Sequence, residues 1–128
     1  IDNNPSRHVF LVMDACFGGT FDQAIAKRGE EDNMYTEITQ SEYIAKKLKY
    51  KTRLYLTSGA KEYVPDGRPG KHSPFASKLI EALRSYGGKN KVITSKQMFW
   101  YVERVRPEPR FGTFGDNEPG SEFVFVAN

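Results

Sequence analysis

The hydrophobic positions of this chain fall into short runs separated by polar segments, and they predict alternating strands and helices. His8–Asp14 and Thr52–Ser58 are runs rich in β-forming residues. The first is continuously apolar, which is typical of a strand buried on both faces of a parallel sheet. Glu122–Val126 predicts a third strand near the end of the chain. Strands that alternate with helices indicate an α/β fold with a largely parallel sheet covered on both faces.

Four helices are predicted around these strands. Each has a polar residue that can cap its first turn and apolar residues at helical spacing. Their expected ranges are Thr20 or Asp22 to about Lys27, Ser41–Leu48 capped by Ser41, Ser73 to Gly87, and Ser95–Val105 capped by Thr94 or Ser95. The third should bury one face, formed by Phe75, Ala76, Leu79, Ile80 and Leu83. Segments 28–39, 59–71 and 110–119 are expected to be loops or irregular, and long loops often carry function.

Composition narrows the class of protein. The 128 residues include nine Phe, seven Tyr and one Trp, which suits one globular domain. No apolar run is long enough to cross a membrane and no signal peptide is visible, so we expect a cytoplasmic protein without a membrane partner. The net charge of +3 is too small to indicate a nucleic-acid partner. One cysteine excludes an internal disulfide, and two histidines argue against a His/Cys metal site.

The candidate chemistry lies where the first predicted strand ends. The segment at 14–19 reads Asp-Ala-Cys-Phe-Gly-Gly, and sites in open parallel sheets form beyond the carboxyl ends of the strands. A cysteine followed by small, flexible residues can present its sulfur to a cleft as a nucleophile. A single cysteine can equally be a small buried hydrophobic residue. The residues alone leave both interpretations of Cys16 open.

That segment resembles the nucleophile motif of the caspase-like cysteine peptidases, in their bacterial and metacaspase-type branch. The animal caspases have Gln where this chain has Asp14. Two later parts of the chain resemble the family in the same order: Leu56–Ala60 with His72–Phe75, and Pro109–Phe114 with Gly120–Phe125. The resemblance covers residues 6–126. It implies a caspase-like three-layer sandwich, mostly parallel, of which residues 1–128 would form the C-terminal portion.

The resemblance implies an endopeptidase with a Cys-His dyad. Cys16 would attack the scissile carbonyl as a thiolate, form an acyl-enzyme, and offer its backbone N–H to the oxyanion. The catalytic His of such enzymes lies about 50 residues before the cysteine, and only His8 precedes Cys16. An extended segment 8–16 would separate them by ~26 Å, so His8 cannot be the base. His72 matches a different motif position, so we expect the base on a companion N-terminal chain or a missing segment.

The resemblance also implies polypeptide substrates cut after Arg and, second, Lys. In metacaspases and paracaspases the residue that matches Asp14 recognises a basic side chain, and a carboxylate pairs with Arg in a bidentate way that Lys cannot copy. Ser58 is expected to line the same pocket. Glu62 and Asp66 are expected either to complete it or to be solvated loop residues. No cofactor is expected: calcium activates some relatives, but the acidic residues here lack metal-loop spacing.

Two other functions are compatible with the same residues. A caspase-like interaction module without turnover would fit a chain that lacks its own base. A flavodoxin-like or Rossmann-like binding domain would fit a strand followed by Gly18-Gly19, although the chain has no Gly-x-Gly-x-x-Gly and no phosphate-loop lysine. A sheet of only three strands would also leave poorly covered edges, so further strands are expected from an earlier segment or a second chain.

Overall fold

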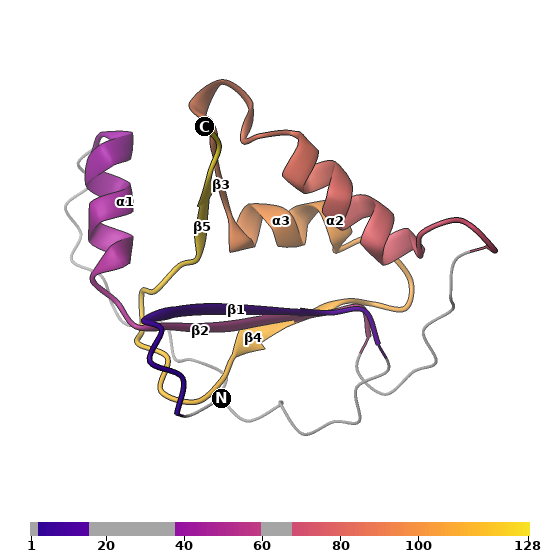
Figure 1. Ribbon diagram of the computed structural model, residues 1–128, viewed down its shortest axis with the longest axis horizontal. Helices are drawn as coiled ribbons and strands as arrows, with labels where there is room; N and C mark the ends of the chain where they lie inside the picture. The colour runs from indigo at the N-terminus through magenta and orange to yellow at the C-terminus, as the bar shows by residue number, and fades with distance from the viewer. Residues whose placement is uncertain (1–2, 16–37, 60–67) are drawn as a thin grey trace.

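The chain is a mixed α/β protein in a computed structural model that describes residues 3–15, 38–59 and 68–128 (Figure 1). The α/β class predicted from the sequence is confirmed. The expected helix from Thr20 or Asp22 to Lys27 lies outside the described residues. The elements are β1 (His8–Met13), α1 (Gln40–Leu48), β2 (Thr52–Thr57), α2 (Pro74–Arg84), the 3₁₀ turn η1 (Gly88–Asn90), β3 (Val92–Thr94), α3 (Ser95–Val102), β4 (Arg110–Thr113) and β5 (Val124–Val126).

The larger sheet has the strand order β1-β2-β4 and mixes both strand directions. β1 and β2 are parallel, as expected, and pair from His8 opposite Thr52 onward. β2 pairs antiparallel with β4, so the expectation that segment 110–119 is irregular throughout is wrong. The sequence of β4, Arg-Phe-Gly-Thr, has no clear alternation of apolar and polar residues. It becomes a strand by hydrogen bonding to the edge of β2 that β1 does not occupy. Gly112 permits the close approach, since a Cβ there would lie 2.8 Å from the Tyr55 ring.

The last strand belongs to a different sheet. β5 pairs antiparallel with β3 in a separate two-stranded sheet, so the prediction that Glu122–Val126 extends one largely parallel sheet is wrong. In Figure 1 this pair runs across the direction of β1 and β2. The chain enters β3 through Gly87, which has a φ of +70° and lies so close to Val92 that a Cβ would collide with its backbone at 2.3 Å. Only glycine fits that turn.

Two helices begin with a reciprocal capping box. The Thr39 side chain accepts a hydrogen bond from the Glu42 backbone N at 3.3 Å, and the Glu42 carboxylate accepts one from the Thr39 N at 3.0 Å. Thr39 is therefore the cap of α1, and the prediction of Ser41 is wrong, because only Thr39 has an acidic residue three positions later. α3 has the same arrangement between Thr94 and Gln97.

α2 begins as predicted, with Ser73 as its cap and Pro74 in its first turn. Its buried face agrees with the prediction at Phe75, and Leu79 packs against both buried clusters described below, but Leu83 does not belong to that face. Phe75 and Ala82 are buried, whereas Leu83 is 41% exposed. Two turns of helix take about 7.2 residues, so Ala82 lies beneath Phe75 and Leu83 turns toward solvent.

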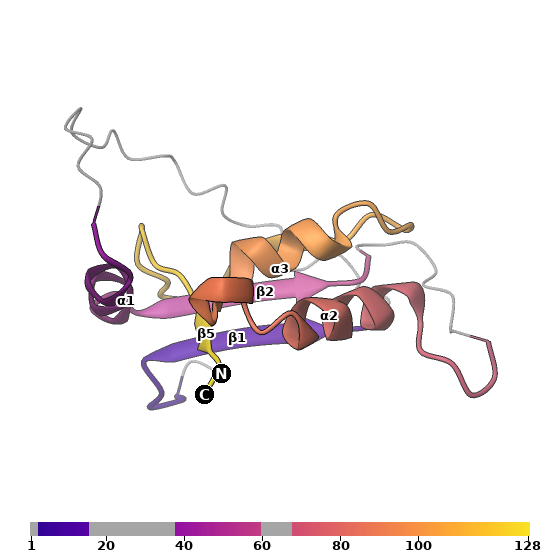
Figure 2. The same cartoon turned by 90° about the horizontal axis from the view of Figure 1, so that it is seen from above.

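α2 and α3 lie side by side on the same face of the larger sheet, above β1 and β2 (Figures 1 and 2). One buried cluster joins the sheet to both helices through Leu56, Phe75 and Val102. A second cluster consists of Ala82, Ile93 and Met98, and Phe10 packs against both clusters. No helix within the described ranges is long and apolar enough to cross a membrane. The expected three-layer sandwich stays a prediction.

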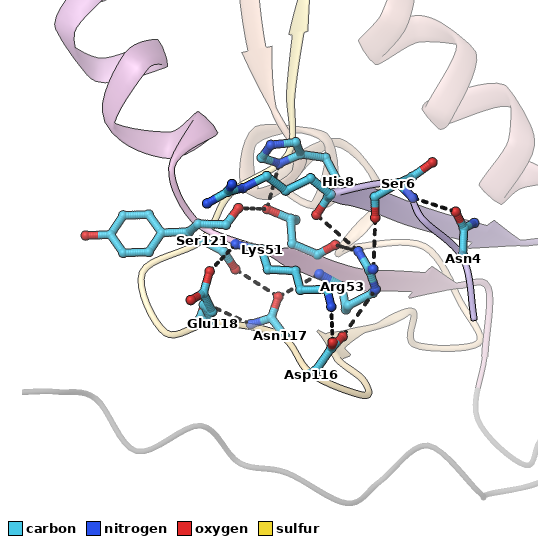
Figure 3. A network of polar contacts seen from close by, with 12 residues as sticks. Asn4, Ser6, His8, Lys51, Arg53, Asp116, Asn117, Glu118 and Ser121 are labelled. Atoms are coloured by element: carbon cyan, nitrogen blue, oxygen red, sulfur yellow. Dashed lines mark hydrogen bonds and ion pairs between the residues drawn. The ribbon is translucent and has the colours of Figure 1, made fainter. Parts of the chain in front are cut away.

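A polar network fixes the amino ends of β1 and β2 (Figure 3). The side chain of Arg53 is only 2% exposed. Its guanidinium donates to the carbonyls of Ser6 at 2.8 Å and Arg7 at 3.1 Å, and it forms an ion pair with Asp116 at 3.4 Å. Its backbone N–H donates to the Asn117 side chain at 2.8 Å. One side chain therefore ties the segment before β1 to the loop after β4.

Lys51 shares Asp116 with Arg53. The hydrogen bond from the Lys51 ammonium to the Asp116 carboxylate lowers the pKa of that carboxyl, and the charge of Arg53 adds to the effect. A folded-state pKa below the ordinary value means that this contact stabilises the fold above that ordinary value. The contribution is lost as the pH falls through the lowered pKa.

Arg53→Met is expected to lower the free energy of unfolding by about 2 kcal/mol, since hydrogen bonds to charged groups contribute more than neutral ones. Methionine keeps the apolar bulk but supplies none of the guanidinium's donors. Urea unfolding followed by circular dichroism measures the loss. The matched control is Arg84→Met at an exposed position of α2, where a change within about 0.5 kcal/mol is expected. A similar small loss for both variants would contradict the structural role of Arg53.

Candidate active site

Two polar residues leave the sheet together at the carboxyl ends of β1 and β2. The register pairs Met13 with Thr57, so Asp14 and Ser58 follow next to each other. The Ser58 N–H donates to the Met13 carbonyl at 3.0 Å, which continues the parallel ladder one residue beyond β2. Neighbouring strands lie ~4.8 Å apart. The two positions are therefore neighbours at the edge of the sheet where the sequence predicts a site.

The carboxylate of Asp14 is held by the start of α2. The Ser73 hydroxyl donates to Asp14 Oδ2 at 2.5 Å and accepts from the Ala76 N–H at 3.0 Å. Asp14 is exposed whereas Ser73 is buried, so the contact orients a solvent-facing carboxylate from its inner side. Each carboxylate oxygen can accept more than one hydrogen bond. Oδ1, which has no hydrogen-bond partner among the described residues, is free to receive a second donor.

Ser58 differs from its neighbours because its hydroxyl has no hydrogen-bond partner within the described part of the chain. Its side chain is 1% exposed. Most buried polar side-chain atoms in folded proteins are hydrogen-bonded. At the other end of the same strand, the buried Arg53 side chain is fully engaged. The carboxyl end of β2 therefore holds an unused donor and acceptor directly beside the position of Asp14.

The remaining predicted site residues, Cys16, Glu62 and Asp66, lie outside the described residues. The two histidines of the chain are both described. His8 is the first residue of β1, and its Nδ1 lies 3.1 Å from the Thr52 hydroxyl. It stands at the end of the strand opposite Asp14, which confirms that it opens the strand.

His72 immediately precedes the cap of α2 and is exposed. This is the helix-entry position expected from the sequence. Within the described ranges, no group of three or more His, Cys, Asp and Glu residues is placed to hold a metal ion.

One functional contact has no signal in the sequence. Ser73 is recognisable as a helix cap, because it precedes Pro74 and an apolar helical pattern. Its hydrogen bond to Asp14 joins residues 59 positions apart. No local pattern predicts that the start of α2 lies over the end of β1. The contact follows only from the packing of α2 on the sheet.

Comparison with known proteins found no match: no family model, no curated protein and no solved structure corresponds to this chain. The resemblance to caspase-like peptidases therefore rests on the three sequence segments named above. The activity that it implies is argued below from those residues and from the geometry around Asp14 and Ser58.

Proposed function

We propose that this chain is part of a cysteine endopeptidase of the caspase-like type, which cuts polypeptides after arginine and, less efficiently, after lysine. One observation carries the proposal. The carboxyl ends of two parallel strands bring Asp14 and the unbonded hydroxyl of Ser58 together, and Cys16 follows Asp14 by two positions in the sequence. The proposed specificity carboxylate and pocket hydroxyl thus lie at the same edge of the sheet, and the proposed nucleophile follows that carboxylate by two positions in the sequence.

In the proposed reaction, Cys16 loses its thiol proton to a histidine and its sulfur attacks the scissile carbonyl carbon. The oxyanion accepts a hydrogen bond from the Cys16 backbone N–H. The histidine then returns the proton to the leaving amine, and an acyl-thioester remains on Cys16. Water, deprotonated by the same histidine, hydrolyses the thioester and releases the carboxylic acid.

The histidine is proposed to come from a companion N-terminal segment of the same protease. His8 does not suit the role, since it opens β1 at the far end of the strand. His72 is not proposed as the base, because it matches a different position of the family's motifs. Among the described strands, β1 is also an outer one in the order β1-β2-β4, with apolar residues along its length. An outer strand of this kind readily pairs with a further strand, which supports a companion segment along this edge.

The preference for arginine is proposed to depend on how Asp14 is oriented. Ser73 fixes Oδ2, so the plane of the carboxylate is set before a substrate arrives. A planar guanidinium can then donate to Oδ1 in the plane of the carboxylate, whereas an ammonium has no planar fork of donors. Ser58 is proposed to line the same pocket. Glu62 and Asp66 are proposed to add negative charge around the same pocket.

Affinity labelling tests this function directly. A blocked arginine chloromethyl ketone should alkylate Cys16, with loss of chloride and formation of one thioether that mass spectrometry locates. The lysine reagent should react more slowly, and the aspartate reagent should not react. Iodoacetamide reports the general reactivity of the thiol. Labelling by iodoacetamide without labelling by the arginine reagent would favour an interaction module without turnover. Fastest labelling by the aspartate reagent would contradict the role of Asp14.

A further inference from the structure

A pocket lies away from the strand ends, between α1 on one side and β3 and α3 on the other. Figure 1 shows α1 facing the pair formed by β3 and β5 across this region. The pocket has a volume of about 560 Å³, which falls within the range of small-molecule sites. The wall residues that matter here are Tyr43, Lys96, Trp100 and Glu122.

The wall contains a buried carboxylate that forms no ion pair with another described residue. Glu122 is only 3% exposed. Its Oε1 accepts hydrogen bonds from the Ser95 hydroxyl and from the Phe123 N–H, the latter at 3.2 Å. Its Oε2 has no hydrogen bond, and Glu122 forms no ion pair, within the described residues. Lys96 lies in the same wall but is exposed and forms no ion pair with it. Buried charged groups are almost always paired.

Two aromatic side chains line the same pocket. Trp100 is 63% exposed, so much of its indole surface is open to a ligand. Burial raises the pKa of the Tyr43 phenol, and the negative charge of Glu122 raises it further, so the carboxylate acts on the ring across the pocket. Aromatic faces attract cations, and a guanidinium also stacks on them. The Lys47 ammonium already lies over the Tyr43 ring, 5.5 Å from its centroid, so Trp100 offers the open aromatic face for a planar cation beside the carboxylate.

We propose that this pocket binds a guanidinium group, such as that of an arginine side chain, with Glu122 as the counter-ion and Trp100 as its aromatic wall. The guanidinium donates to Glu122 Oε2 while Oε1 keeps its bonds to Ser95 and Phe123. Because the pocket is formed by elements other than the strand ends that hold Asp14 and Ser58, this inference does not depend on the peptidase activity.

Trp100 is the single tryptophan of the chain, and it lines this pocket, so tryptophan fluorescence reports on the surroundings of this one side chain. Titration with N-acetyl-arginine amide should give a saturable change, with a dissociation constant on the order of 1 mM, as expected for a ligand of this size. N-acetyl-citrulline amide has nearly the same shape without the charge and should bind at least about tenfold more weakly. An equal response to both compounds would overturn the proposal.

Glu122→Gln removes the charge but keeps an oxygen that can accept from Ser95 and Phe123. It should weaken arginine amide binding by about tenfold or more. Glu103→Gln, at an exposed position just after α3, is the matched control and should bind normally. Unchanged binding by a folded Glu122→Gln variant would contradict the proposal. If that variant does not fold, Trp100→Leu at an exposed position should show the weakened binding by calorimetry, and unchanged binding there would contradict it as well.

Arginine amide is also a ligand for the site proposed at Asp14, so the titration is repeated with Asp14→Asn. The Trp100 response should remain the same in that variant. A response that disappears with Asp14→Asn and persists with Glu122→Gln would assign the binding to the strand ends. That result would support the peptidase pocket and overturn the second site.

Discussion

Replacing Cys16 with alanine is expected to abolish the cleavage of arginine peptides, with a loss on the order of 10⁴-fold or more in kcat. The reason is chemical: the methyl side chain cannot form the thioester through which the reaction passes. The measurement is the release of a fluorescent amine from peptides that end in arginine, with the wild-type protein and the variant compared at equal concentration. Circular dichroism establishes that both are folded.

The matched control for this experiment is His72→Ala. His72 is exposed at the entry to α2 and is not the proposed base, so its removal should leave cleavage within about twofold of wild type. Cleavage that survives Cys16→Ala would rule out the proposed nucleophile. Loss of cleavage in a folded His72→Ala variant would show that the base belongs to this chain and not to a companion segment.

Replacing Asp14 with asparagine is expected to lower kcat/KM for arginine peptides by about 10²–10³-fold, the range measured when one partner of a close charge pair is removed. Asparagine retains an oxygen that can accept from Ser73, so the start of α2 keeps its contact. Only the charge toward the substrate is lost. Peptides that carry citrulline in place of arginine should be cut equally slowly by both proteins.

Asp116→Asn is the corresponding control. It removes a carboxylate at the amino end of β2, beside Lys51 and Arg53, and should leave the ratio of arginine to citrulline cleavage unchanged. An arginine preference that persists in Asp14→Asn would assign recognition to other acidic groups, Glu62 and Asp66 first. Faster cleavage of aspartate peptides by the wild-type protein would contradict a basic specificity altogether.

The parts of the fold that the sequence predicts are those with a strong local pattern. β1 and β2 are nearly continuous runs of β-forming residues, and α2 has both a cap and an apolar face. β4 could not be predicted, because Arg110–Thr113 becomes a strand only through its pairing with β2. The partner of β5 is likewise decided by packing, since three residues carry too little pattern to select a sheet.

The candidate site divides in the same way. The positions of Asp14 and Ser58 follow from two predicted strands and the rule that parallel strands end at one edge of a sheet. The orientation of Asp14 by Ser73 could not be foreseen, because it depends on where α2 packs. The pocket around Glu122 is formed by segments distant in sequence. The local sequence around Glu122 predicts only a strand, so it gives no sign of the pocket.

The Phe10 side chain connects the two sheets. Its ring contacts Phe111 of the larger sheet at 6.5 Å between centroids, and Phe123 and Phe125 near or within the smaller one at 5.7 and 6.2 Å. An isolated pair of strands is at best marginally stable in water. Phe10 is thus one of the side chains that pack β3 and β5 against the rest of the molecule, and the two sheets are expected to unfold in a single cooperative transition.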